Sequence, residues 1–65
     1  MIKWLLIVTI HMTTGFTTEQ AVGKPHDTAS QCHDAVAEFF FNESPKLLDL
    51  PEIKGVDIKC RKTVQ

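Results

Sequence analysis

The chain has 65 residues, a formal net charge of −1 at pH 7 and two cysteines, and 43% of its residues are hydrophobic. The near-neutral charge, without a basic stripe interleaved with aromatic residues, argues against binding to nucleic acid. So short a chain has little room for a pocket that buries a substrate, so we expect neither an enzyme nor a cofactor.

The N-terminus begins with one positive charge, at Lys3, followed by the apolar run Trp4–Ile10. A charged start before a short apolar run is the order of a secretory signal peptide. His11 and the threonines after it end the run after about ten residues, whereas a membrane-spanning helix needs about 20. We therefore predict a signal peptide over residues 1–15 rather than a membrane anchor; a buried N-terminal strand is the alternative.

Two positions fit cleavage of this signal, because signal peptidase needs small residues at −3 and −1. Cleavage after Gly15 lies closer to the apolar run, and cleavage after Gly23 has the better A-x-G pattern, so both stay open. Residues 16–28 are polar and without a sustained period, and we predict a flexible N-terminal arm there. The product of about 40 to 50 residues is small enough to need a staple beyond its hydrophobic core.

The strongest periodic segment is residues 29–42, which we predict to form an amphipathic helix. Its apolar residues recur at i, i+3, i+4, i+7 and i+8, the spacing that lines one helix face. They are Cys32, Ala35, Val36, Phe39 and Phe40. Thr28 is suited to the N-cap, and Gln31 three residues later gives the capping-box spacing.

A short second helix is predicted over residues 45–50, because Ser44 is a good N-cap, Pro45 suits the first helical position and Pro51 ends the run. Three leucines lie in or beside it and have little use in water: Leu47, Leu48 and Leu50. We expect them to fold back onto the phenylalanines of the first helix. The two helices would then form a hairpin with a short connection.

The end of the chain alternates Val56, Ile58 and Cys60 with charged residues, which is the period of a strand with one buried face. Because no partner strand is predicted within the chain, we expect an extended segment along the first helix. Alternatively, two copies pair these segments edge to edge.

Both cysteines lie in the part that survives processing, and an even number in a small secreted chain predicts a disulfide. Joining Cys32 to Cys60 would stabilise the fold by about 3.5 kcal/mol on the chain-entropy model; an intermolecular bond would instead give a covalent dimer. The predicted fold is thus a small, mainly α unit over residues 29–65, stapled by one disulfide.

Other residue combinations offer little chemistry. Cys32, His33 and Asp34 are adjacent, so on a helix their side chains splay apart and cannot form a catalytic relay. His26 and His33, each followed by an aspartate, match no zinc-binding spacing, so no metal ligands are predicted. Asn42-Glu43-Ser44 fits the N-glycosylation rule, although the proline after the serine hinders the transferase.

Three consecutive phenylalanines, residues 39–41, sweep about 200° of a helix surface. Phe41 lies off the main apolar stripe. Burial under the Leu47-Leu48 turn is favoured, because exposed aromatic side chains lower solubility. The alternative is that Phe41 is exposed as an anchor for another protein.

The charge distribution is uneven. Six acids against one lysine lie in the middle of the chain: Asp27, Asp34, Glu38, Glu43, Asp49 and Glu52, with Lys46. An acidic helix disfavours a membrane-lytic, host-defence role and stable membrane insertion after signal cleavage. We expect a small secreted, non-enzymatic peptide that acts as an extracellular ligand or modulator on a protein or receptor, with the layout of gland secretions such as seminal fluid or venom. The alternative is a secreted protease inhibitor whose binding loop contains Leu50–Ile53.

Overall fold

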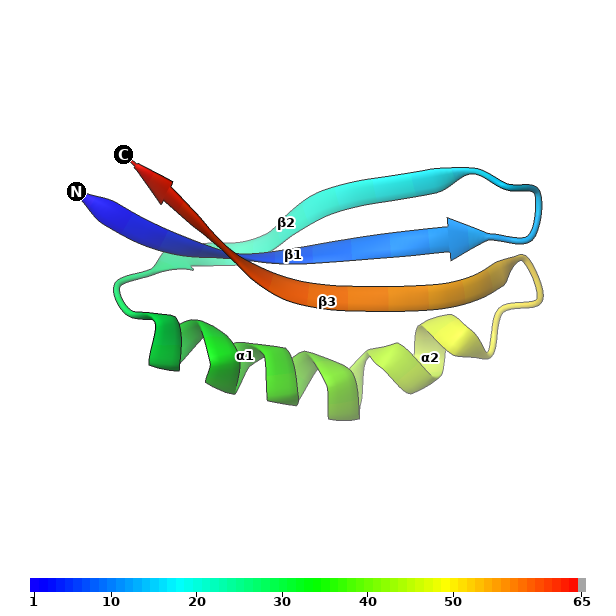
Figure 1. The fold of residues 1–65 in the computed structure, drawn as a ribbon. Helices are drawn as coiled ribbons and strands as arrows, with labels where there is room; N and C mark the ends of the chain where they lie inside the picture. The colour runs from blue at the N-terminus through cyan, green and yellow to red at the C-terminus, as the bar shows by residue number, and fades with distance from the viewer. Residues whose placement is uncertain (65) are drawn as a thin grey trace.

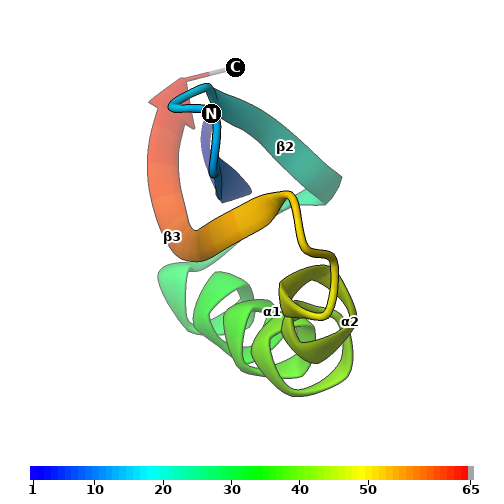
Figure 2. The same cartoon turned by 90° about the vertical axis from the view of Figure 1, so that its right-hand side faces the viewer.

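The computed structural model describes residues 1–64, which form a three-stranded antiparallel sheet with two helices on one face (Figures 1 and 2). The elements are β1 (Ile2–Met12), β2 (Thr17–His26), α1 (Ala29–Asn42), α2 (Ser44–Leu48) and β3 (Ile53–Val64). Strand accounts for 52% and helix for 30% of the structure. The predicted mainly α fold is therefore wrong.

The central strand is β1, which pairs with β2 on one side and β3 on the other. Its middle residues Leu6, Ile7 and Val8 are 4%, 4% and 1% exposed, so they form most of the buried apolar core. A strand covered on both faces needs a continuous apolar run rather than an alternating one. The residues predicted as a signal peptide thus build the centre of the sheet, and cleavage after residue 15 would remove that strand from this fold.

Strand β2 follows a turn in which Gly15 adopts a φ of 95° and the Met12 N–H donates to the Phe16 carbonyl at 2.8 Å. The flexible arm predicted over residues 16–28 is instead this strand for most of its length. The sequence pattern does not predict β2, because it is a polar edge strand with most side chains exposed and no apolar alternation. It is also irregular, since Gly23 has a φ of 76° where the register with β1 shifts.

Helix α1 has the bounds predicted from its period, and its N-terminus is capped as the sequence indicates. The Gln31 N–H donates to the Thr28 hydroxyl at 3.1 Å. The Gln31 side-chain oxygen in turn accepts a bond from the Asp27 N–H at 3.1 Å. The first bond satisfies a backbone donor that the first helical turn leaves without a partner, and the second ties the residue before the N-cap to the helix.

The predicted helical hairpin is wrong, because α2 continues along the same side of the sheet as α1 (Figure 1). Backbone bonds carry the helical path across the junction: the Glu43 N–H donates to Phe39, and the Glu43 carbonyl accepts from Lys46 and Leu47. α2 ends at Leu48, two residues before the predicted end. The expected burial of the leucines on the first helix is wrong for two of them, because Leu48 and Leu50 are exposed.

Strand β3 confirms the predicted alternation, with Val56, Ile58 and Cys60 half-buried and the charged residues between them exposed. Its expected position beside the first helix is confirmed by the Cys32–Cys60 bond, but the expectation that it has no strand partner is wrong. β3 pairs with β1 from Ile2↔Val64 to Met12↔Ile53. The partner went unrecognised because its residues had been assigned to the signal peptide.

Candidate functional site

The disulfide joins Cys32 of α1 to Cys60 of β3, 28 residues apart in sequence, which confirms the predicted pairing within one chain. The two Cα atoms lie 6.1 Å apart, within the usual range for a bridge. Cys32 is fully buried, and Cys60 stands opposite Leu6 in the β1–β3 ladder. The bond therefore fixes α1 onto the face of the sheet that contains Leu6 and Val8.

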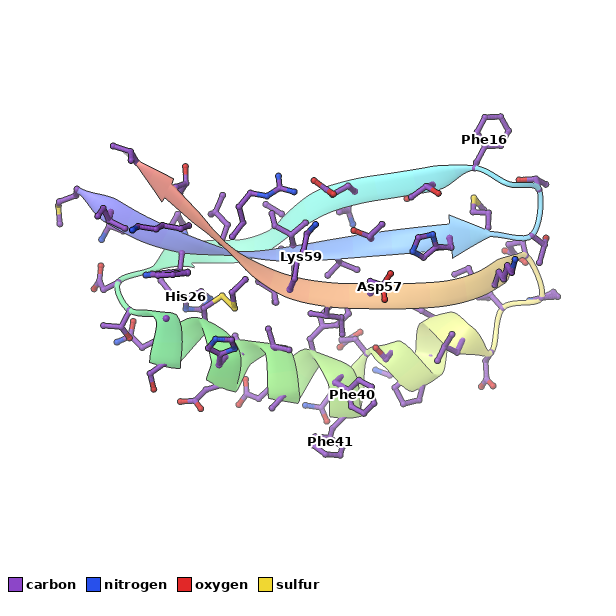
Figure 3. The ribbon with its side chains drawn as sticks, viewed as in Figure 1. Phe16, His26, Phe40, Phe41, Asp57 and Lys59 are labelled. Atoms are coloured by element: carbon purple, nitrogen blue, oxygen red, sulfur yellow. A yellow bond between two sulfur atoms is a disulfide. The ribbon has the colours of Figure 1, made fainter. Side chains whose placement is uncertain are left out.

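On the side of α1 away from the sheet, Phe40 and Phe41 are 58% and 74% exposed. Figure 3 shows the Phe41 ring on the side of α1 away from the strands and the Phe40 ring beside the end of α1. Their centroids are 5.6 Å apart with an interplanar angle of 83°, the edge-to-face arrangement that aromatic pairs favour. The favoured burial of Phe41 is wrong, because α2 runs onward from α1 and leaves that ring uncovered.

Two carboxylates accompany these rings, because Asp34, Glu38 and Phe41 occupy positions i, i+4 and i+7 of α1. Both acids are exposed, and in residues 1–64 neither forms an ion pair. We call Asp34, Glu38 and Phe41, with Phe40 at their edge, the acidic aromatic face. It combines an exposed aromatic pair with two carboxylates that form no ion pair in residues 1–64.

Charges on the sheet are arranged differently, because they pair with one another. On the face away from the helices, Glu19 of β2 accepts a bond from Arg61 of β3 at 2.6 Å and has Lys59 at 3.8 Å. The hydrogen bond from Arg61 lowers the pKa of Glu19 below its usual value. His11 and Asp57 lie 2.8 Å apart further along this face. On this face, Glu19 thus has two cations beside it, and Asp57 has the His11 imidazole.

A further ion pair joins Lys3 at the start of β1 to Asp27, just before α1. The hydrogen bond from Lys3 lowers the pKa of Asp27. The pair therefore connects the N-terminal strand to the cap of the helix.

A groove of about 280 Å³ lies between α1 and β2. Its apolar lining includes Leu6, Val22 and Phe39, and its polar lining includes Lys24 and Glu38. No buried side-chain N or O atom of residues 1–64 lacks a hydrogen-bond partner, so the groove contains no orphaned polar group directed at a ligand. It is open to solvent along the flank of the acidic aromatic face, with which it shares Glu38.

The remaining predicted site residue, Asn42, is exposed at the end of α1, and its glycosylation stays a prediction. Ser44 of the same motif is 4% exposed. Within residues 1–64, no three His, Cys, Asp or Glu side chains gather as a metal site, and no helix is both long and apolar enough to cross a membrane.

Residues Leu50–Ile53, predicted as an inhibitor loop, form the turn from α2 into β3. The Ile53 N–H donates to the Leu50 carbonyl at 3.1 Å, and the Glu52 carbonyl accepts from the Thr13 N–H at 3.0 Å. One hydrogen bond thus closes this turn, and the other joins it to the β1–β2 turn.

Sequence reasoning missed the cross-strand pairs, Arg61–Glu19 and His11–Asp57. The alternating charges of β3 indicate that Asp57 and Arg61 lie on the same face of that strand. Their partners lie in β1 and β2, and neither of these segments was predicted to be a strand. Exposed Phe16, beside the turn between these two strands, was missed for the same reason.

No protein-family model, curated protein or solved structure matches this chain.

Proposed function

We propose that the protein is a small non-enzymatic extracellular ligand or modulator that contacts a protein or receptor through the acidic aromatic face, with Phe41 as the anchor. The observation that carries the proposal is the exposed, edge-to-face pair Phe40–Phe41 on the outer side of a covalently fixed helix. Aromatic side chains are enriched among the residues that dominate binding energy. Exposed aromatic rings lower solubility, and a binding role explains why they are nevertheless exposed.

The disulfide supports both the location and the mode of binding. Stable disulfides form and persist in oxidising compartments such as the extracellular space. The bond from Cys32 to Cys60, together with the Thr28 cap, holds α1 in place before a partner arrives. A fixed surface binds with a smaller loss of conformational entropy than one that must first become ordered.

The proposal is tested by comparing Phe41→Ser with Phe16→Ser. Phe16 is 73% exposed, almost the same as Phe41, but lies beside the β1–β2 turn, so it is a matched control (Figure 3). Each protein is labelled, and saturable binding to intact cells of the source organism is measured together with the melting temperature. We expect Phe41→Ser to weaken binding by at least about tenfold, as for a hot-spot residue, while Phe16→Ser binds normally and both melt like the wild type.

Two results would contradict the proposal. One is the absence of saturable binding by the wild type. The other is equal binding by wild type and Phe41→Ser. A large fall in the melting temperature of Phe41→Ser would show that Phe41 stabilises the fold rather than serving as an anchor.

A secreted protease inhibitor is the second candidate, supported by exposed Leu50 in its hydrogen-bonded turn. A loop held before binding loses little entropy in a protease cleft. Inhibition of a serine-protease panel by the wild type, lost in Leu50→Gly but not in Leu48→Gly, would favour this function. No inhibition of any protease in the panel would reject it.

A further inference from the structure

We infer that the partner segment recognised by the acidic aromatic face is a cationic amphipathic helix. This inference rests on the proposed function and specifies the chemistry of the partner. It follows from the shape of the face, from its unneutralised charge and from the way the two features are spaced along α1.

The spacing is that of a straight stripe. Asp34, Glu38 and Phe41 repeat at i, i+4 and i+7, which places them along about 10 Å of one side of the helix. The Phe40 ring adjoins this stripe through its contact with Phe41. A partner that covers Phe41 must therefore also lie over two carboxylates, one helical turn apart.

The balance of charges on the helices indicates the sign of the charge that the partner carries. Two acids beside the sheet strands have cationic partners, Glu19 with Arg61 and Asp27 with Lys3, and Asp57 has His11 beside it. The helix layer differs, with four acids and one cation, Lys46, between residues 29 and 50. The acids are Asp34, Glu38, Glu43 and Asp49, and none has an ion pair within residues 1–64. A basic partner gains attraction to this layer, and an acidic one is repelled.

The shape of the face favours a helix over a strand. α1 is a convex ridge, and a second helix packs on such a ridge by placing its own i±3 and i±4 rows into the neighbouring grooves. An extended segment would instead use the backbone edges of β2 or β3, which are elsewhere in the fold. Lysine or arginine one turn apart on the partner helix would match Asp34 and Glu38, with a leucine about one turn further along over Phe41.

The test uses two designed peptides of about 18 residues with the same helical leucine pattern, one with lysines and one with glutamates at the polar positions. Binding to the intact, oxidised protein is measured by calorimetry at about 0.05 M and 0.5 M salt. We expect only the lysine peptide to bind, with affinity falling by at least about tenfold at the higher salt because exposed charges are screened.

Variants then locate the site. Phe41→Ser and the double variant Asp34→Asn/Glu38→Gln should each weaken binding of the lysine peptide by about fivefold or more, as expected for an anchor and a pair of rim charges. The controls Phe16→Ser and Glu52→Gln change the same residue types outside the face and should bind as the wild type does. Melting curves of all variants establish that they are folded.

The inference is overturned if the glutamate peptide binds as well as the lysine peptide, or if the face variants bind like the controls. Phe41-dependent binding to vesicles of zwitterionic lipid, without binding to either peptide, would assign the face to a membrane and also overturn it. Failure here leaves cell-surface binding through Phe41 intact, whereas failure of the proposed function would abolish that binding even if the lysine peptide bound.

Discussion

Arg61 of β3 and Glu19 of β2 are hydrogen-bonded at 2.6 Å although the whole of β1 lies between their strands. Their side chains reach toward each other over the face of the sheet that has no helix. Ile7 of β1 lies on this same face, opposite Lys59, and is only 4% exposed. The long stems of the charged residues therefore help to cover an apolar side chain that would otherwise face water.

The first prediction is a change in acid stability on replacing Glu19 with glutamine. The pKa of Glu19 is lowered in the fold, so its contribution is present above the ordinary glutamate pKa of about 4.3 and is lost as the pH falls through the lower, folded value. Melting temperatures between pH 7 and pH 2 should therefore fall less steeply for Glu19→Gln than for the wild type. The effect should be small, because the pair is exposed.

Glu52→Gln is the control for this experiment, since Glu52 lies in the turn before β3, outside the ion-pair network. It should follow the wild-type curve over the acid range. Parallel curves for Glu19→Gln and the wild type would show that the Arg61 bond does not contribute to stability.

The second prediction concerns the disulfide. The double variant Cys32→Ala/Cys60→Ala should lose about 3.5 kcal/mol of unfolding free energy, the denatured-state entropy of a loop of this length. Denaturant titrations of the oxidised wild type, the reduced wild type and the variant would measure this loss. Equal midpoints for the oxidised and reduced wild type would mean that the bond does not constrain the unfolded chain.

The third prediction tests the core. Val8 is 1% exposed in the central strand, and Val8→Ala should cost about 2 kcal/mol through lost burial and an unfilled cavity. Val64→Ala removes the same atoms from a side chain that is 80% exposed at the end of β3, and should cost almost nothing. Similar losses of unfolding free energy for the two variants would show that Val8 is not part of the core.

The fourth prediction distinguishes the two interpretations of the N-terminal apolar run, a signal peptide and a central strand. A synthetic chain of residues 16–65 lacks β1, the only strand that pairs with either β2 or β3 among the described residues. Its circular dichroism should show no cooperative thermal transition, in contrast to the full chain. A cooperative transition in the shorter chain would show that it can fold in a different way.

The intact mass of the natural protein complements this experiment. A mass beginning at Met1 would agree with the fold described, whereas one beginning at Phe16 or Lys24 would confirm signal cleavage and require another fold. A mass of two chains that halves on reduction would indicate a covalent dimer.

Features encoded locally could be predicted from the sequence. The bounds of α1 follow from its apolar period and from the Thr28 cap, both of which depend on neighbouring residues alone. The alternation of β3 is likewise local. The pairing of Cys32 with Cys60 could be predicted because the described chain contains no other cysteine.

The sheet could not be predicted in this way, because the run Trp4–Ile10 has the length and composition of both a signal-peptide core and a buried central strand. Once it is assigned to a signal, β3 has no partner and β2 has only its polar side chains to indicate a strand. The exposure of Phe41 depends on the same choice. Without the sheet, the leucines after α1 must bury themselves on that helix, and the aromatic ring is covered.

The pairing of Ile2 with Val64 has a consequence for how the chain folds. β1 is synthesised well before β3, which it needs beside it, so their pairing joins segments far apart in the sequence. Contacts so far apart are slow to form, because the loop between them must be closed first. On the ribosome, β1 and β2 can meet as a hairpin, but the sheet cannot be completed until β3 has left the exit tunnel. In the interval, the apolar residues of β1 are available to chaperones.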